Sequence, residues 1–283
     1  MAATELKPLL KLVETARVRF HENPEGGRTD RLKQRIASDA FLKNPPIVAD
    51  MGGGDYLLLD GANRVSVFRE LGYSHIPVQV VDYGDKAVQL KGWHHLLVEA
   101  QALDLRGHYA ALPGVKLAQV RWEDLAHILE LRQVFAVLVE DHDSCWGLFP
   151  EDGNGEIEMF RRIEVMHGTV DGYEGRSRLE RIKLADYSLL PDVVGSVEHQ
   201  LALFPTLHKG ELLHAASKGV MMPTGLTRHI IPGRALGLNL DLGFLTDGST
   251  PAQMQAHFQA FTDKLAMDGR IRYYEESVFI MNE

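Results

Sequence analysis

The segment Asp60-Gly61-Ala62-Asn63-Arg64 combines residue types that bind phosphate at the start of a helix. The first turn of a helix carries unpaired backbone N–H groups and a partial positive charge, which together stabilise an anion. Gly61 has no Cβ, so its backbone can approach a phosphate closely. Asn63 can donate hydrogen bonds, and the Arg64 guanidinium matches phosphate geometry. We therefore predict a phosphate-binding site, with an ordinary surface Asp-Gly turn and a solvated arginine as the alternative.

Two histidine-containing clusters are weaker candidates for chemistry. His94 and His95 are adjacent, and neighbouring residues on a helix point to different faces, so core or surface roles are expected for them. Asp141-His142-Asp143, near Cys145, does not match the spacing of known metal sites and is predicted to be a polar turn. Neither cluster predicts a metal centre.

The elements that must hold the phosphate-binding segment follow from hydrophobic spacing. Short apolar runs at 47–49 and 56–59, joined by glycines, predict a β-hairpin. Apolar residues at helical spacing predict a helix over 63–71, which a glycine then ends. An amphipathic helix is predicted over 29–42 and a strand over 75–83. The segment would then join a strand to a helix.

The rest of the chain is predicted to alternate between helices and strands, giving a mixed α/β (α+β) fold. Helices are expected over 4–15 (or an irregular lead-in), 92–103, 123–131, 155–170, 209–219 and 252–266. Strands are expected over 133–141, 145–152, 199–205, within 229–240 and within 271–283, with a helix and a strand within 175–195. We place a domain boundary after residue 104, giving domains 1–104 and 105–283.

Composition excludes several classes of protein. The 283 residues carry a net charge of −9, whereas dedicated DNA-binding proteins usually carry a basic surplus. A single cysteine allows no internal disulfide and fits a reducing cytoplasm. No apolar run is long enough to span a bilayer, and the first residues lack the features of a signal peptide. We therefore expect a cytoplasmic protein without membrane or nucleic-acid partners.

The order of elements around YLLLDGANRVSVFRELGYSHIPVQVVDY resembles the N-terminal domain of the ParB/sulfiredoxin superfamily. In that superfamily the loop usually reads Asp-Gly-His-His-Arg, precedes a helix and a Pro-Val strand, and binds nucleotide phosphates. Here Ala62 and Asn63 stand where histidines are common. Asn63 can still bond a phosphate, whereas Ala62 contributes only its backbone.

Three further stretches are similar to the free L-serine kinase branch of this superfamily. They are RFHE at 19–22, LKGWHHLL at 90–97, and ALFPTLHKGELLHAASKGVMMPTGLTRHIIPGRALGLNL at 202–240. The resemblance covers most of the chain and implies an active site in the cleft between two domains. One departure concerns Thr224-Gly225-Leu226, where archaeal members tend to have a lysine.

The resemblance implies roles for individual residues. Glu22 matches the catalytic glutamate that accepts the serine proton, and Asp60, the second catalytic carboxylate, would help to bind Mg²⁺. The donor phosphates would lie on Gly61, Ala62, Asn63 and Arg64. The alternative for Glu22 is a solvated loop residue.

The same resemblance places the amino-acid substrate in the C-terminal half. Arg228, with Thr227 and His229, would bind the serine carboxylate, and Trp93 would form a wall of the substrate pocket. The alternatives are a core or interface role for Trp93 and solvent exposure for Arg228 and His229.

The predicted function is transfer of a phosphoryl group from a nucleotide to free L-serine, giving O-phospho-L-serine. The resemblance favours ADP as the donor, with ATP as the other possibility, and Mg²⁺ as the metal; a homo-oligomer is possible. A DNA-binding or regulatory ParB-like protein, a sulfiredoxin-type reductase and a haem-binding sensor are the alternatives. The reductase would need a cysteine beside the loop, and Cys145 is far from it in sequence.

Overall fold

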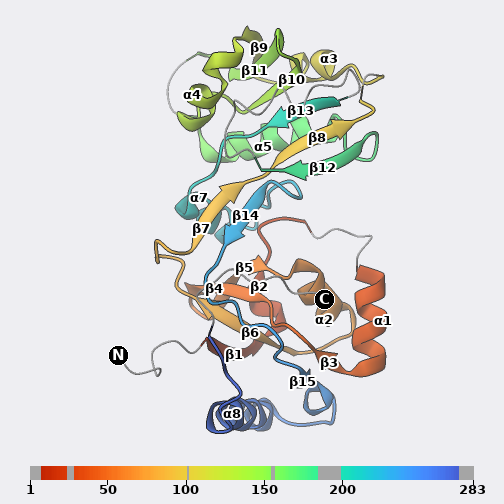
Figure 1. The fold of residues 1–283 in the computed structure, drawn as a ribbon, viewed down its shortest axis with the longest axis vertical. Coiled ribbons are helices and arrows are strands. Elements are labelled where there is room, and N and C mark those ends of the chain that lie inside the picture. Colours follow the sequence, from red (N-terminus) through yellow and green to blue (C-terminus); the bar gives the residue numbers. More distant parts are fainter. Residues whose placement is uncertain (1–7, 24–28, 101, 154–156, 184–198, 274–283) are drawn as a thin grey trace. The chain divides into compact units, whose positions relative to one another are not determined.

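The computed structural model describes residues 8–23, 29–100, 102–153, 157–183 and 199–273 (Figure 1). The chain divides into two compact units. Unit 1 contains Met1–Gln89 and Ile230–Glu283, and unit 2 contains Leu90–His229. The fold mixes helices and strands in both units, as predicted.

Unit 1 is built on a five-stranded sheet in the order β1-β6-β4-β5-β2. Its strands are β1 (Leu9–Glu14), β2 (Val18–Arg19), β4 (Ile47–Gly52), β5 (Asp55–Asp60) and β6 (His75–Val81). Strand β1 pairs with β6 and β4 pairs with β5 in antiparallel fashion, whereas β4 pairs with β6 and β2 with β5 in parallel. Its helices before the chain leaves the unit are α1 (Thr29–Asp39) and α2 (Ala62–Glu70), with the 3₁₀ turn η1 (Thr15–Arg17) between β1 and β2.

The β4–β5 hairpin carries the chain to the phosphate-binding segment. Its turn contains Gly52, Gly53 and Gly54, whose φ angles are 81°, 63° and 85°. Only glycine readily adopts a left-handed backbone conformation at three successive positions, which explains why the turn contains three glycines. Strand β5 then ends at Asp60, and α2 begins two residues later.

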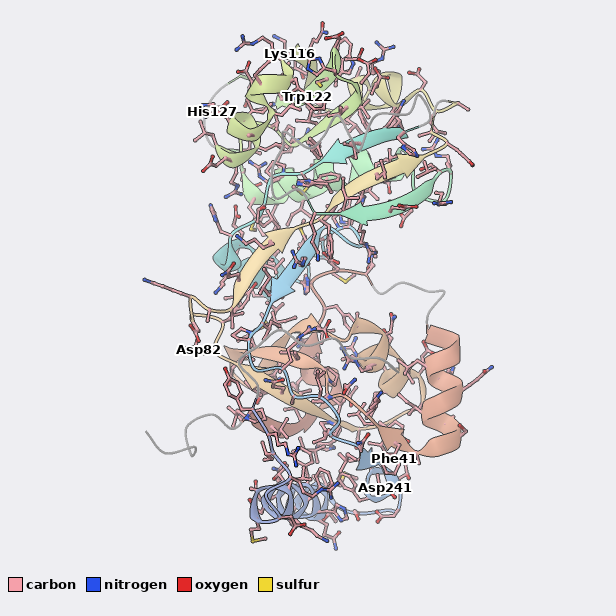
Figure 2. All side chains as sticks on the ribbon, in the orientation of Figure 1. Phe41, Asp82, Lys116, Trp122, His127 and Asp241 are labelled. Carbon is pink, nitrogen blue, oxygen red and sulfur yellow. The ribbon has the colours of Figure 1, made fainter. Side chains whose placement is uncertain are left out.

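The C-terminal part of the chain completes unit 1. It contributes β15 (Leu240–Asp241), η5 (Gly243–Leu245) and α8 (Pro251–Met267). Strand β15 pairs with β3 (Phe41–Leu42), and Figure 2 labels the paired residues Phe41 and Asp241. Met254 and Phe258 of α8 are buried in the same core as strands β1 and β6.

Unit 2 contains a six-stranded sheet in the order β12-β8-β13-β10-β11-β9, in which every pair is antiparallel. Its strands are β8 (His94–Val98), β9 (Val115–Val120), β10 (Ala136–Asp141), β11 (Ser144–Pro150), β12 (Arg178–Ile182) and β13 (His199–Leu203). Its helices are α3 (Leu105–Ala110), η3 (Trp122–Asp124), α4 (Leu125–Glu130), α5 (Met159–Asp171) and α7 (Lys209–Ser217). A separate two-stranded sheet pairs β7 (Gln89–Gly92) with β14 (Thr227–Ile230).

Most strongly patterned elements were predicted correctly. The hairpin at 47–59, the helix after Gly61, the strand from residue 75, the hairpin from 133 to 152 and the long helix from 252 are all present. The strand expected within 175–195 is β12, whereas residues 184–198 lie outside the described part of the chain. The strands expected within 271–283 are not found in 271–273, and the remaining residues are not described.

Two predicted helices are strands. The segment predicted as a helix at 4–15 forms β1 over its described residues, because it pairs along its whole length with β6. Within the segment 92–103, also predicted as a helix, His94–Val98 form β8, which lies between β12 and β13. All five residues of β8 are buried, so a run without strand-like alternation was mistaken for a helix.

The two units differ from the predicted domains. The chain leaves unit 1 near residue 89 rather than 104, and it returns at residue 230. Strand β8 pairs only with strands of unit 2, which moves this division toward the N-terminus. The return of residues 230–283 arises from contacts between residues far apart in sequence, which hydrophobic spacing does not reveal.

Candidate active site

The start of α2 has the geometry of an anion-binding site. Gly61 is the N-cap residue, with φ 100° and ψ 31°, and its carbonyl accepts a hydrogen bond from Val65 N–H at 3.1 Å. Because Gly61 has no side chain, it cannot cap the first turn. The backbone N–H groups of Ala62, Asn63 and Arg64 precede the first intrahelical donor. They are therefore directed out of the helix start, where a phosphate would meet them.

Glycine is required at position 61 for two reasons. Its φ lies in the positive region that side chains disfavour. A Cβ built there would also lie 3.0 Å from Pro46 Cβ and 3.0 Å from Arg64 Nε. A side chain at position 61 would therefore require Pro46 or Arg64 to shift.

The side chain of Arg64 is engaged within the protein. Its Nη1 donates to the carbonyl oxygens of Asn44 at 2.9 Å and Pro45 at 3.1 Å, and its Nη2 donates to Asp60 Oδ2 at 2.8 Å. The side chain is 22 % exposed. These bonds fasten the loop to the segment before β4, so Arg64 has a structural role that the sequence did not predict.

Arg234 was not identified from the sequence. Its Nη2 lies 3.2 Å from Asp60 Oδ2, so the Asp60 carboxylate joins two guanidinium groups beside the helix start. Arg234 follows Pro232-Gly233 in the segment that returns to unit 1. The sequence offered only a basic residue after a Pro-Gly pair, and that pattern does not indicate a binding site unless the fold is known.

Glu22 lies on the continuation of β2. Strand β2 pairs in parallel with β5, Val18 opposite Tyr56 and Arg19 opposite Leu57. The chain then bends at His21, and Glu22 forms an isolated β-bridge three residues after β2 ends. The pairing of β2 with β5 places the segment that leads to Glu22 beside the strand that ends at Asp60.

His21 anchors this extension of β2. It is buried, and its Nδ1 lies 2.6 Å from the carbonyl oxygen of Leu58. Because a carbonyl can only accept, Nδ1 carries the proton. Burial lowers the pKa of His21, against the opposing effects of the nearby Glu22 charge and the Leu58 hydrogen bond. A neutral His21 therefore fixes the backbone beside Glu22.

Within unit 2, the structure brings Trp93 and Arg228 together. The Arg228 guanidinium carbon lies 5.2 Å from the centre of the Trp93 ring, and Lys183 Nζ lies 5.5 Å from it. The backbone N–H of Trp93 donates to the Leu226 carbonyl at 2.9 Å, which places the tryptophan beside the Thr-Arg-His strand. Both cations contact the π face of the ring, the arrangement typical of cation–π pairs.

The three residues of the Thr-Arg-His motif do not share one face. Thr227, Arg228 and His229 are consecutive residues of β14, and successive side chains of a strand point to opposite sides. Thr227 and His229 therefore face away from the side that carries Arg228. The sequence-based hypothesis that all three side chains bind one carboxylate does not follow from this geometry.

Two buried histidines support the turn before β14. His95 Nδ1 accepts from the Tyr173 hydroxyl at 2.7 Å, and His95 Nε2 donates to the Gly225 carbonyl at 3.0 Å. His94 Nδ1 accepts from Phe204 N–H at 3.2 Å. Burial is the main cause that lowers the pKa of each histidine to about 4, so both are neutral at pH 7. They belong to the core, one of the roles the sequence left open.

Gly225 stands within the stretch where the resemblance leads one to expect a lysine. It has φ +80°, and a Cβ there would lie 2.2 Å from Arg181 Nε. The Arg181 side chain therefore packs against the bare backbone of this turn.

Comparison with known proteins reveals several relatives. No family model matches the chain. An ATP-dependent L-serine kinase from Desulfurococcus mucosus is 34% identical over 226 residues, which cover 78% of this chain and 85% of the relative. The chain belongs to the L-serine kinase family. The ATP-dependent L-serine kinase SbnI of Staphylococcus aureus is 26% identical over 276 residues, 97% of each chain.

Solved structures share the fold of this L-serine kinase family member. SbnI with a C-terminal truncation, from Staphylococcus aureus, has a TM-score of 0.73 and 24% identity, and the match covers 92% of this chain and 97% of SbnI. A mutant free serine kinase in complex with AMP has a TM-score of 0.67 and 16% identity, over 84% of this chain and 94% of its own. These matches support the fold alone.

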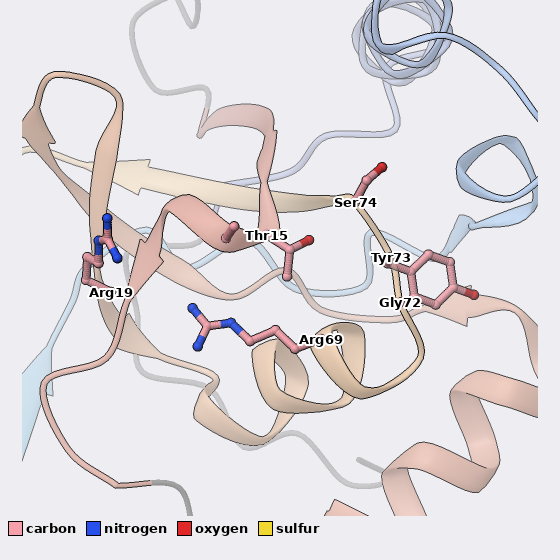
Figure 3. Close-up of a pocket in the computed structure, with 7 residues that line it drawn as sticks. Thr15, Arg19, Arg69, Gly72, Tyr73 and Ser74 are labelled. Carbon is pink, nitrogen blue, oxygen red and sulfur yellow. The ribbon is translucent and has the colours of Figure 1, made fainter.

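A hollow in unit 1 of this L-serine kinase family member lies apart from the start of α2. It is lined by Thr15, Ala16, Arg19, Arg69, Gly72, Tyr73 and Ser74, with a volume of about 450 Å³. Figure 3 shows Arg19 and Arg69 reaching toward it from β2 and from the last turn of α2. The carbonyl end of a helix carries partial negative charge, so positive charge at this hollow comes from the Arg19 and Arg69 side chains and not from a helix start.

One residue of this L-serine kinase family member bears on the reductase alternative. Cys145 is buried in β11 of unit 2, and burial, aided by Asp141 and Asp143, raises its pKa to about 12. A protonated, buried thiol is not a reductase nucleophile.

Among the described residues, no group of three or more potential ligands could hold a metal ion. No helix in that part of the chain is long and apolar enough to cross a bilayer.

Proposed function

We propose that this chain transfers a phosphoryl group from a nucleotide to the hydroxyl of free L-serine, producing O-phospho-L-serine. The observation that carries the proposal is the 34% identity to an ATP-dependent L-serine kinase over 78% of the chain. The helix start at Gly61 supports it, because such a site stabilises the charged phosphates of a donor.

Phosphoryl transfer depends on positioning and charge neutralisation. In the proposed reaction a bond forms between the serine hydroxyl oxygen and the terminal phosphorus, while the bond from that phosphorus to the bridging oxygen breaks. The hydroxyl proton passes to Glu22, and the nucleotide leaves with one phosphate fewer. The backbone of Gly61–Arg64 would hold the phosphates, while Arg64 keeps the loop in shape through Asn44 and Pro45.

Asp60 fits Mg²⁺ only as a partner of bound phosphates. Its Oδ2 accepts from Arg64 and lies beside Arg234, which leaves Oδ1 as the oxygen without a bond to either guanidinium. Mg²⁺ commonly takes one or two carboxylates together with substrate phosphates. When bound, the metal would neutralise charge on the transferred group.

For the amino acid, Arg228 is the proposed carboxylate partner, with Trp93 as the wall of its pocket. The Arg228 guanidinium carbon lies 5.2 Å from the centre of the Trp93 ring, which supports placing both residues at one pocket. Thr227 and His229 lie on the other side of β14 and are proposed to act separately from Arg228 in binding serine.

ATP is the proposed donor, because the three relatives are named ATP-dependent. ADP, which the sequence resemblance favoured, is the alternative. A free serine kinase structure with ADP bound describes that protein and does not decide between donor and product here.

The test is incubation of the purified protein with L-serine, Mg²⁺ and either ATP or ADP. O-phospho-L-serine is expected with ATP, together with ADP in equal amount, and omission of Mg²⁺ should abolish both. Formation of AMP and phosphoserine from ADP alone would make ADP the donor. A folded protein that gives phosphoserine with neither nucleotide would refute the proposed function.

A further inference from the structure

Within the described residues, Arg234 has donors without a protein acceptor. Its guanidinium forms an ion pair with Asp60 there, with Nη2 3.2 Å from Oδ2. Its side chain is 40 % exposed. Arg64, on the other side of the same carboxylate, donates three hydrogen bonds to protein acceptors. Of the two arginines beside the helix start, Arg234 has more donors left for a ligand within the described part of the chain.

A buried glutamine fixes the backbone on both sides of Arg234. Gln79 Nε2 donates to the Gly233 carbonyl at 2.8 Å, and Gln79 Oε1 accepts from Ala235 N–H at 2.8 Å. Gln79 is only 3 % exposed, in a strand whose neighbouring residues Val78 and Val80 are buried and apolar. An amide there is costly to bury unless both its groups are bonded. These two bonds hold the Arg234 backbone against β6.

The return segment has further attachments to the loop. Asn44, whose carbonyl binds Arg64, accepts Gly237 N–H on its side-chain oxygen at 2.8 Å. Gly233 has φ +62°, which lets the chain turn before Arg234. The helix start and Arg234 are therefore held in one local framework, entirely within unit 1.

Charge at this framework favours an anion. Asp60 carries one negative charge, while Arg64 and Arg234 carry two positive charges, and the start of α2 adds a partial positive charge. One carboxylate between two guanidinium groups leaves these three side chains with one net positive charge, which a phosphate group would offset.

We propose that Arg234 binds the phosphates of the donor nucleotide and that Gln79 is its positioning residue. Asp60 orients the guanidinium, the exposed donors contact phosphate oxygens, and the Gln79 clamp keeps the backbone in place. The inference rests on the proposed function, but the binding of a polyphosphate can be tested without turnover.

The first experiment measures the binding of inorganic tripolyphosphate, ATP, ADP and adenosine by calorimetry. A charge-assisted hydrogen bond contributes about 1.5–3 kcal/mol, so Arg234→Ala should weaken tripolyphosphate, ATP and ADP by about 10- to 100-fold. Adenosine affinity should not change, and Arg234→Lys should recover part of the loss. The matched control is Arg270→Ala, an exposed arginine of the same C-terminal segment, which should bind like the wild type.

The second experiment tests the clamp. Gln79→Met keeps the side-chain volume but removes both hydrogen bonds to the return segment. It should weaken tripolyphosphate binding and raise KM for the nucleotide, with KM for serine unchanged. In an Arg234→Ala background the same change should have no further effect on phosphate affinity, because its action passes through Arg234. A second loss of similar size would refute the positioning role.

The outcomes separate this inference from the proposed function. If wild type binds tripolyphosphate and Arg234→Ala binds it equally well, with an unchanged unfolding midpoint, the role of Arg234 is refuted while the kinase proposal stands. If no phosphoserine forms but Arg234→Ala loses polyphosphate affinity selectively, the phosphate-binding role is supported and the kinase proposal fails.

Discussion

At the scale of single residues, Gly61 shows how a backbone conformation creates a binding site. It occupies a positive φ, lacks a capping side chain and lies against Pro46. Each property leaves the first-turn N–H groups of α2 open to a ligand. The site is therefore sensitive to the smallest possible change at this position.

Gly61→Ala should destabilise unit 1 and weaken nucleotide binding. A left-handed backbone costs an alanine about 1–2 kcal/mol, and the 3.0 Å approach of the new Cβ to Pro46 adds to this. Urea unfolding and ATP calorimetry provide the measurements. The matched control is Gly53→Ala, which has φ +63° but nothing within 4 Å, so it should lose stability without losing ATP affinity. Equal ATP affinity in both variants would contradict the role of Gly61.

Glu22→Gln should abolish most of the turnover while nucleotide binding survives. A positioned general base contributes typically 10²–10⁴-fold, so kcat should fall by about that factor. The control is Glu14→Gln, an exposed carboxylate of β1 that forms an ion pair with Arg17. Turnover of Glu22→Gln within a factor of about two of the wild type would exclude Glu22 as the base.

The residue scale also marks the limit of the sequence-based site. The helix start after Gly61 could be predicted, because an Asp-Gly pair before a helix is a local pattern, and phosphate binding there stays a prediction. Arg234 could not, because it reaches Asp60 only through the pairing of distant segments. The hydrogen bonds from Arg64 Nη1 to the Asn44 and Pro45 carbonyls could not be predicted either, since residue type does not indicate backbone acceptors.

At the scale of elements, β8 differs from a typical strand because all five of its residues are buried. It is a central strand with His94 and His95 in the core, and His95 reaches the turn at Gly225. Its sequence was interpreted as a helix because a strand buried on both faces has no alternating pattern. The hairpins β4–β5 and β10–β11 were predicted because turn-forming residues bound short apolar runs.

The histidines of β8 should make unit 2 unstable in acid. Above pH 6.5 both are neutral in the folded and unfolded chain. Between pH 6.5 and about 4 the unfolded chain takes up protons that the folded chain does not, so the free energy of unfolding falls with pH. The loss approaches about 3 kcal/mol for each histidine near pH 4. Urea unfolding between pH 7.5 and 4.5 measures it.

His95→Gln tests the origin of this pH dependence. Glutamine can donate to the Gly225 carbonyl and accept from Tyr173 without titrating. The slope of unfolding free energy against pH should become shallower in this variant. An unchanged slope in His95→Gln would show that other groups cause the acid sensitivity.

At the scale of the whole molecule, the chain forms one discontinuous and one continuous unit. Unit 1 needs α8, because Phe258 is 1 % exposed in its core. The strong helix at 252–266 was predicted, but its partner was not, since spacing reveals an apolar face without revealing what covers it. The predicted domain boundary after residue 104 differs from the observed division for the same reason, because hydrophobic spacing does not reveal which segments pack together.

Phe258→Ala should destabilise unit 1 selectively. Truncating a buried phenylalanine costs about 3–5 kcal/mol. All three tryptophans, Trp93, Trp122 and Trp146, belong to unit 2, so their fluorescence reports on that unit alone. Circular dichroism should therefore reveal an early transition in the variant, while the fluorescence midpoint stays unchanged. A fluorescence midpoint that shifts together with the circular dichroism transition would show that the two units unfold as one.

The return of the chain to unit 1 has a consequence for synthesis. A ribosome releases the whole of unit 2 before it releases Arg234, β15 or α8. The nascent β1–β6 region must therefore wait, with part of its apolar surface uncovered, while some 140 later residues emerge. Chaperone demand and the risk of aggregation should be greatest in this interval, and slowing translation after residue 89 would prolong it.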